Sequence, residues 1–400
     1  MPDPVGSFNP GHFGHACRGD WPIDFSVAFL NHGSFGSVPH AIHAEAEEWR
    51  RRYESHPIEW YGRRTPEEVR KAATCVADFI GSSPERTGFV TNATAAVNGI
   101  LRDIRLESGD EVIVLSHGYG AVKQTVRHLV SMHGAKMVEA EIKLPVSGEQ
   151  SIVAAVEQAI TPRTRLAVID QITSPTALVI PIDPIVKLCS AHDIPVLVDG
   201  AHAPGMLERP ADLSGAAWWT GNLHKWVCAP KGCAILTASA DRVQDTHPPI
   251  ISHGYLDSFS TEFDWQGTRD FAPWLTAPAA IRFWDRYGGM ATVRARNHDL
   301  VCKAHSMLVE QWGVEPISPL DGSLLGSMAT VRLPRSIHDH FGDQPFLDLI
   351  QRLFDEFKVE VPVMEIDEQW FIRISAQVYN ELEDYHRLAD AIDVLAKESS

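Results

Sequence analysis

The spacing of hydrophobic positions changes repeatedly between about residue 65 and residue 200. Stretches with apolar residues three or four apart, such as TPEEVRKAATCVADFIG, are followed by short apolar runs, such as TGFVT and DEVIVLS. Helical spacing predicts amphipathic helices, and short apolar runs bounded by turn residues predict buried strands. Because the two alternate strictly, we expect crossover units, and hence an α/β domain with a large, mainly parallel sheet flanked by helices.

The pattern changes after the apolar run GCAILTAS. A region rich in Gly, His and Pro spans 247–273, and long helical text follows over 274–312. Strand-like runs, including SMATVRLP and WFIRISA, then alternate with two further helical stretches. We therefore expect an N-terminal arm over 1–30, a large domain over 31–285 and a smaller C-terminal α+β domain over 286–400.

Composition narrows the range of partners. The chain has 400 residues, 44% of them hydrophobic, and a formal net charge of -17. Without a basic stripe, this charge repels nucleic acid and anionic lipid, so we expect neither a nucleic-acid nor a membrane partner. The six cysteines show no CxxC pair and no zinc-ligand spacing, which favours reduced thiols in the cytoplasm and no metal site. The start lacks a secretory signal, and no stretch is apolar enough to span a bilayer.

Polar residues gather directly after several of the predicted strands. In open α/β sheets ligands bind beyond the carboxyl ends of the strands, so these junctions are candidate sites. Asp199 follows IPVLV and precedes His202 on the same turn, and a helix that includes Thr94 begins after TGFVT. His117 and Tyr119 follow VIVLS. Each junction therefore places a group that can bind a ligand at one edge of the predicted sheet.

A lysine completes this set. Lys225 stands in TGNLHKWVCAPKG, beyond the strand that Asp199 ends. A helix start binds phosphate through its free N–H groups and its dipole, and lysine forms a Schiff base with an aldehyde. A carboxylate can pair with a protonated pyridine nitrogen, and a ring can stack on the cofactor. Together these features meet the needs of pyridoxal 5'-phosphate (PLP), which predicts an enzyme that acts on amino acids.

Six segments of the chain resemble the class V aminotransferase-fold family of PLP-dependent enzymes, which has fold type I. They stand in the family's order and extend the resemblance from about residue 25 to about residue 395. The branch that they resemble most is that of the isopenicillin N epimerase-like proteins. The segments are LNHGSFG, NATAAVN, VDGAHAPG, TGNLHKWVCAPKG, QGTRD and FIRISAQVYN.

The resemblance implies a role for each matching residue. Lys225 would form the Schiff base, Asp199 would pair with the pyridine nitrogen, and His202 would lie near the phenolic oxygen of PLP. The ring of PLP would stack against His117, with Tyr119 as the less favoured residue. The residues that would surround the phosphate are Ala93, Thr94, Thr220, Asn222 and His224.

Other matches imply a second subunit and a substrate carboxylate. Gly267 and Thr268 match a segment that a second subunit lends to the phosphate, which implies a homodimer. Arg373 matches the family's carboxylate-binding arginine, whose guanidinium can form two parallel hydrogen bonds with a carboxylate. Asn31 and His32 match an N-terminal loop that can close over the substrate.

The fate of the substrate stays open at this point. The resemblance favours epimerisation or racemisation at Cα of an amino acid or amino-acid derivative. The alternative is a β-eliminating C–S lyase that acts on a cysteine conjugate or a cysteine sulfoxide. A desulfurase is disfavoured because its loop thiol is missing: no Cys lies between Leu333 and Arg373. A two-base epimerase needs a second proton donor besides Lys225, and His32, Tyr61 and water are the candidates.

Overall fold

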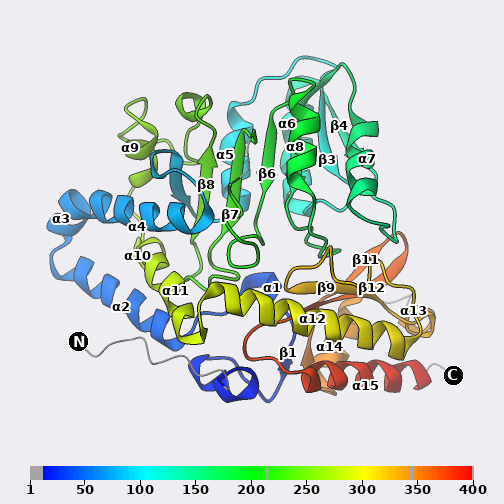
Figure 1. Cartoon of the computed structure of the whole chain (residues 1–400). Helices are drawn as coiled ribbons and strands as arrows, with labels where there is room; N and C mark the ends of the chain where they lie inside the picture. Colours follow the sequence, from blue (N-terminus) through cyan, green and yellow to red (C-terminus); the bar gives the residue numbers. More distant parts are fainter. Residues whose placement is uncertain (1–11, 213–214, 342–345, 399–400) are drawn as a thin grey trace.

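A seven-stranded sheet forms the centre of the larger lobe, with the order β2-β8-β7-β6-β5-β3-β4 (Figure 1). The computed structural model describes residues 12–212, 215–341 and 346–398. Strand β8 is antiparallel to both of its neighbours, and the other neighbouring pairs are parallel, which confirms the predicted α/β fold. The strands are β2 (Thr87–Val90), β3 (Glu111–Leu115), β4 (Lys136–Ala140), β5 (Thr164–Asp170), β6 (Val196–Asp199), β7 (Trp218–Asn222) and β8 (Ala234–Ala238).

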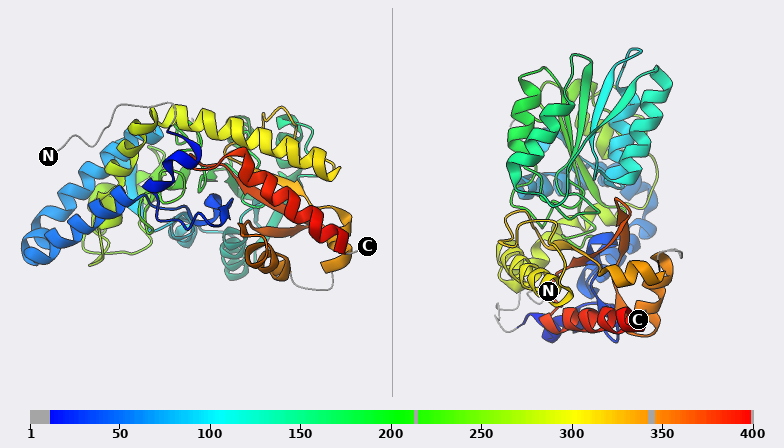
Figure 2. Two further views of the ribbon diagram at one scale, coloured as in Figure 1. Left: turned by 90° about the horizontal axis from the view of Figure 1, so that it is seen from below. Right: turned by 90° about the vertical axis from the view of Figure 1, so that its right-hand side faces the viewer.

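Helices cover both faces of this sheet (Figure 2). Successive strand residues point to opposite faces, so Val112 and Val114 of β3 join one core, whereas Ile113 and Leu115 join the other. The first core is closed by α5 (Ala93–Asp103), α6 (Gly120–His133) and α9 (Phe259–Asp264). The second is closed by α4 (Thr65–Ile80), α7 (Glu149–Ala159) and α8 (Ile182–Ser190). Among the described helices, none has both the length and the apolar character to cross a bilayer.

The N-terminal segment packs against the C-terminal part of the chain. Strand β1 (Ala28–Phe29) pairs in parallel with β10 (Val359–Glu360), and Cys17 and Trp21 are buried. The part of the predicted arm that follows residue 11 is therefore packed, while 1–11 lie outside the described residues. The other elements before α4 are η1 (Gly14–Asp20), α1 (His32–Phe35), α2 (His40–Ser55), α3 (Pro57–Glu59) and η2 (Trp60–Arg64).

The smaller lobe packs helices on a three-stranded antiparallel sheet, with the order β11-β12-β9. Its long helices α12 and α15 lie side by side (Figure 1). The elements of this lobe are α12 (Met290–Trp312), β9 (Met328–Arg332), α13 (Arg335–Phe341), α14 (Phe346–Asp355), β11 (Val363–Ile366), β12 (Gln369–Ser375) and α15 (Leu382–Glu398). Two short 3-10 helices of the larger lobe are η3 (Pro84–Arg86) and η4 (Val243–Asp245).

The long helical text over 274–312 does not form one helix. Gly288 and Gly289 have φ angles of 81° and 87°, in the left-handed region that ends helices. The helical segment therefore ends at this glycine pair, and a new helix, α12, begins after it. The separate pieces that precede this break are α10 (Ala272–Leu275), α11 (Ala277–Phe283) and η5 (Trp284–Tyr287).

The carboxyl edge of the sheet faces the smaller lobe. Asp170, Asp199 and Asn222 end the neighbouring strands β5, β6 and β7. Arg373 of β12 reaches the segment after β5, where its Nη1 donates to the carbonyl oxygen of Ser174 at 2.7 Å. The two lobes thus enclose the edge at which the sequence predicts a ligand.

We expect Asn92→Ala to destabilise the helix that starts at this edge. The Asn92 side chain caps α5 by accepting a hydrogen bond from the Ala95 N–H at 2.8 Å. Loss of such a cap costs about 1 kcal/mol, which urea denaturation of the apo protein measures. Asn98→Ala is the control, because Asn98 lies inside α5, where alanine favours the helix. Equal stability of the Asn92 variant and the original chain would contradict the role of this cap.

Candidate active site

A cavity of about 580 Å³ lies at the carboxyl edge of the large sheet. Its walls come from the ends of the sheet strands, the start of α5 and the N-terminal helix α1. Eight of the predicted site residues line it: Ala93, Thr94, Tyr119, Asp199, His202, Asn222, His224 and Lys225. Eight of the fifteen predicted site residues thus lie on the wall of one cavity.

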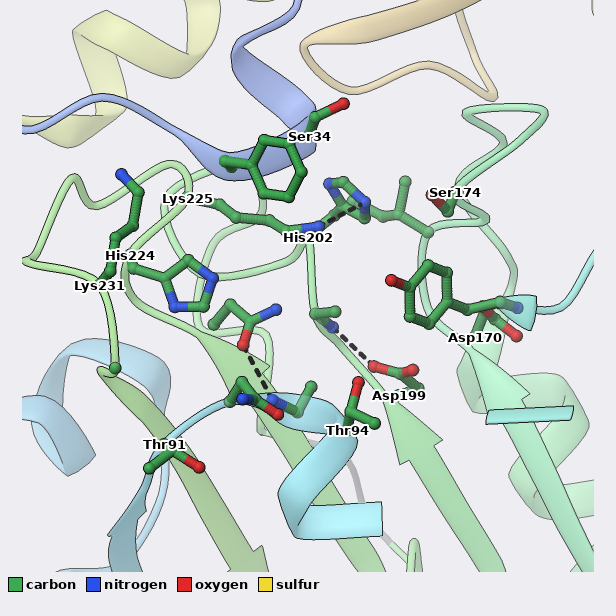
Figure 3. A pocket seen from close by; sticks show the side chains of 18 residues that line it. Ser34, Thr91, Thr94, Asp170, Ser174, Asp199, His202, His224, Lys225 and Lys231 are labelled. Carbon is green, nitrogen blue, oxygen red and sulfur yellow. Dashed lines mark hydrogen bonds between the residues drawn. The ribbon is translucent and has the colours of Figure 1, made fainter. Parts of the chain in front are cut away.

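Lys225 is held in this cavity as an amine that loses its proton easily. Its Nζ lies 3.1 Å from Nε2 of His202, and the two side chains point toward each other (Figure 3). Burial and the positive charge of Arg373 lower the pKa of Lys225 to about 7, against the opposing effect of the Asp199 carboxylate. Near neutral pH a large fraction of Lys225 is therefore an uncharged nucleophile.

Asp199 lies beside a second buried carboxyl group, that of Asp170. The two residues pair in register across β5 and β6, and each is 3% exposed. Burial raises the pKa of Asp199, whereas the Ala201 N–H at 3.0 Å and the charge of Lys225 favour its ionised form. Burial and Asp199 raise the pKa of Asp170 well above its usual value. The sequence prediction missed Asp170, although it ends the apolar run RLAVID and the same strand-end rule applies to it.

The start of α5 offers donors to a phosphate. The Ala93 N–H donates to Oδ1 of Asn222 at 2.9 Å and the Ala95 N–H donates to the cap, so Thr94 N–H has no partner among the described residues. His224 also faces this region, and burial with the nearby charge of Lys225 lowers its pKa to about 4. These groups can bind an anion at a helix N-terminus.

Two residues change the predicted phosphate site. Thr220 does not line the cavity, because it is fully buried in β7 and its hydroxyl donates to the Ile235 carbonyl at 2.8 Å. Lys231, which the sequence prediction missed, does line it, and its ammonium donates to the Gly36 carbonyl at 2.9 Å. The cavity therefore holds one more cation than predicted.

Arg373 is a buried cation without an acidic partner among the described residues. Its Nη1 donates to the carbonyl and hydroxyl oxygens of Ser174, and its Nη2 donates to the Ser34 hydroxyl at 3.0 Å. Its Nε has no partner in the described structure, and the side chain is 4% exposed. Burial lowers the pKa of Arg373 to about 10. A buried guanidinium without a carboxylate is a site for an anionic ligand.

The N-terminal loop acts on this site indirectly. Asn31 does not line the cavity, but its side chain accepts a hydrogen bond at 2.5 Å from Ser34, which does. His32 is fully buried behind the loop that carries Lys225, which joins β7 to β8. Its Nε2 donates to the Lys225 carbonyl at 3.0 Å, and its Nδ1 lies 2.8 Å from the Tyr379 hydroxyl. His32 thus supports Lys225 from behind, and nothing places its side chain against a substrate. Sequence reasoning missed Ser34, although the quoted segment LNHGSFG contains it.

Two further expectations differ from the geometry. His117 does not line the cavity, because its ring is buried with Nδ1 3.4 Å from the Thr176 hydroxyl, whereas Tyr119 lines the cavity and is 43% exposed. Of the two residues expected to stack on the ring, Tyr119 is thus the one that lies on the cavity wall. Gly267 and Thr268 lie between α9 and α10, away from the cavity of their own chain, and Thr268 is exposed.

The chain matches the family model described as aminotransferase class-V over residues 36–388. It belongs to the class V aminotransferase family. A probable chloroplastic L-cysteine desulfhydrase of Arabidopsis thaliana is 33% identical, over 94% of this chain and 84% of the relative. An isopenicillin N epimerase of Streptomyces clavuligerus is 30% identical, over 95% of this chain and 98% of the relative. The solved apo structure of a cysteine desulfurase from Thermococcus onnurineus NA1 has a TM-score of 0.81 at 17% identity, and the match covers 98% of this chain and 100% of that one.

Class V membership makes the chain a PLP-dependent enzyme. The described residues fit this cofactor. Thr94 keeps a backbone donor for a phosphate, Lys225 is poised to react with an aldehyde, and Asp199 supplies a buried carboxyl group in the same cavity. The cavity therefore offers a partner for the phosphate, for the aldehyde and for the pyridine nitrogen of PLP.

Capture of PLP by the apo enzyme is expected to depend on pH with a midpoint near 7. Attack on the aldehyde requires the uncharged amine, and the pKa of Lys225 is about 7. The fraction of uncharged amine rises as pH rises through this value and falls about tenfold per unit well below it. The rate at which the visible band of bound PLP appears measures this fraction. A midpoint near 10, where free lysine titrates, would contradict the burial of Lys225.

Proposed function

We propose that this enzyme is a β-eliminating C–S lyase that acts on a cysteine-type amino acid. The observation that carries the proposal is a buried cation that can bind a carboxylate, close to an amine that can lose its proton. Arg373 does not itself line the cavity, but it donates hydrogen bonds to Ser34 and Ser174, which line it together with Lys225. Arg373 is buried without an acid among the described residues, and Lys225 titrates near neutrality. An α-amino acid brings a carboxylate for the first of these residues and a Cα–H bond for the second.

Different residues of the chain have different roles in the removal of the Cα proton. When bound, PLP withdraws electrons from Cα of an attached amino acid, which makes the Cα proton acidic. Arg373 holds the substrate carboxylate, and Lys225 anchors the cofactor and then accepts the Cα proton at Nζ. Asp199 holds the positive charge of the pyridine nitrogen. Thr94, with its neighbours Asn222 and His224, holds the phosphate.

The absence of a thiol from the wall favours release of the sulfur group. Among the residues that line the cavity none is Cys. Cys228 is closest in sequence to Lys225, but its Sγ is buried 3.4 Å from the Lys225 carbonyl oxygen, and burial raises its pKa. No thiolate is thus placed to take up sulfur from a substrate. β-Elimination needs only one base at Cα and no such thiol, and the relatives named L-cysteine desulfhydrase support this choice.

Epimerisation is the second candidate, and the position of Tyr119 favours it. An epimerase needs a proton donor besides Lys225, and Tyr119 brings a phenol to the cavity wall. The other side-chain candidates lie elsewhere: His32 is behind the loop that carries Lys225, and the Tyr61 ring packs on those of Tyr53 and Phe271. The relatives named isopenicillin N epimerase support this alternative.

We also propose a homodimer in the cytoplasm. Thr268 is exposed, and a Cβ on Gly267 would meet no atom within 4 Å, which leaves this turn accessible to a second copy of the chain. The six cysteines are free thiols, as a reducing compartment requires. Sedimentation of the holoenzyme is expected to give twice the mass of the chain. A monomeric holoenzyme would contradict a contribution of Gly267 and Thr268 to the site of a second subunit.

Arg373→Ala is expected to weaken substrate binding without changing the spectrum of bound PLP. Loss of a charged hydrogen-bonding partner costs about 1.5–3 kcal/mol, so the apparent KM should rise roughly 10- to 150-fold. Arg332→Ala is the control, because Arg332 pairs with Phe371 on the neighbouring strand but is partly exposed near Glu315. A disturbed PLP spectrum with an unchanged KM would reassign Arg373 to the cofactor.

The reaction itself can be read from the products. The holoenzyme in deuterated water is offered L-amino acids, cysteine conjugates and cysteine sulfoxides, and proton NMR follows each mixture. Pyruvate and ammonia from the sulfur compounds are the expected result. Recovery of amino acid with inverted configuration and deuterium at Cα would instead establish the epimerase. Neither product, with no exchange at Cα, would contradict both functions.

A further inference from the structure

A buried tryptophan contacts the histidine that contacts Lys225. The indole N–H of Trp226 donates to Nδ1 of His202 at 3.4 Å, and Nε2 of His202 lies 3.1 Å from Nζ of Lys225. Trp226 is 2% exposed and His202 is 1% exposed. Figure 3 shows the second of these contacts. The three side chains therefore form a short hydrogen-bonded chain that ends at the reactive amine.

The direction of this chain follows from the chemistry of its first member. An indole nitrogen can only donate, so Nδ1 of His202 must accept. A neutral imidazole that accepts at Nδ1 carries its proton on Nε2. Burial and the charge of Lys225 hold the pKa of His202 well below its usual value, so the ring is neutral. Its Nε2–H therefore points at Lys225, whose nitrogen can accept only when it is an uncharged amine.

We propose that Trp226 is a positioning residue: its N–H fixes the tautomer of His202 and thereby keeps Lys225 as a free amine. The inference rests on the proposed function, in which Lys225 reacts with the cofactor. It adds a residue that touches neither cofactor nor substrate. The family resemblance places the phenolic oxygen of PLP beside His202. An anionic oxygen needs a hydrogen-bond donor, and the Nε2–H of the same tautomer supplies one.

The packing around Trp226 holds its ring in place. Trp226 shares a buried cluster with Ile172, Ala177, Met206 and Met328, which come from both lobes. A Cβ on Gly205, which has a φ of 84°, would approach the Trp226 backbone to 2.9 Å. The indole therefore has little freedom to turn its N–H away from His202.

Other charged groups around the amine do not replace this hydrogen bond. Arg373 and burial lower the pKa of Lys225, and Asp199 raises it. Lys225, Arg373 and His224 all lower the pKa of His202. Among the described residues, only His202 lies within hydrogen-bonding distance of Nζ of Lys225. The tautomer of His202 thus decides whether Nε2, the atom that faces Nζ of Lys225, is a hydrogen-bond donor or an acceptor.

The experiment measures the pH midpoint of PLP capture by the apo forms of three proteins. In Trp226→Phe the imidazole can move its proton to Nδ1, so Nε2 can accept from an ammonium and the midpoint should rise by about one pH unit. At pH 6.5 the capture rate should then fall several-fold. Trp284→Phe is the matched control, because its buried indole donates to the Val227 carbonyl instead, at 3.2 Å. It should titrate as the original chain does.

An unchanged midpoint in Trp226→Phe would overturn the proposal. If that variant does not fold, His202→Gln decides: its amide can turn an oxygen to the ammonium, so its midpoint should rise as well, and an unchanged midpoint overturns the proposal. A failure of the proposed role of Lys225 gives a different result. In that case the original chain forms no borohydride-reducible link to PLP, or the Lys225→Ala variant still forms that link.

Discussion

This site depends on one constraint: charged side chains are removed from water at the junction of the two lobes. Arg373 and Asp199 are buried and Lys225 is half-buried, yet the three residues belong to a strand of the small lobe, a strand end of the large lobe and a loop of the large lobe. For Lys225 the shift of its pKa from 10.5 to about 7 corresponds to about 5 kcal/mol that favours the uncharged form. The hydrophobic cores on the two faces of the large sheet and in the smaller lobe offset this cost, and an uncharged amine near neutral pH is the result.

The junction between the lobes sets the position of the reactive lysine. His32 in the N-terminal helix α1 donates to the Lys225 carbonyl, and its other ring nitrogen contacts Tyr379 from the C-terminal part of the chain. Trp226, the next residue along, is packed by residues of both lobes. Segments that are far apart in the sequence thus meet at the backbone of one loop, which explains why an N-terminal histidine matters to the site without lining it.

Local sequence patterns were enough to predict the sheet, the start of α5 and the position of Asp199 at the end of a strand. These features depend on hydrophobic spacing and on residues that are neighbours in the chain. The positions of His117 and Thr220 could not be predicted in this way, since each is decided by the direction in which a side chain leaves a turn or a strand. The helical text over 274–312 is divided for a local reason, because two glycines with left-handed φ angles precede α12. Contacts between lobes, such as that of Arg373 with Ser34, carry no signal in local spacing.

Whether Lys225 is the amine that binds the cofactor can be determined from the holoenzyme itself. The holoenzyme is reduced with borohydride, digested and mapped by mass spectrometry. The mass of the reduced pyridoxyl phosphate group is expected on the peptide that contains Lys225. Its presence on another lysine, such as Lys231, with an unmodified Lys225, would show that Lys225 does not bind the cofactor.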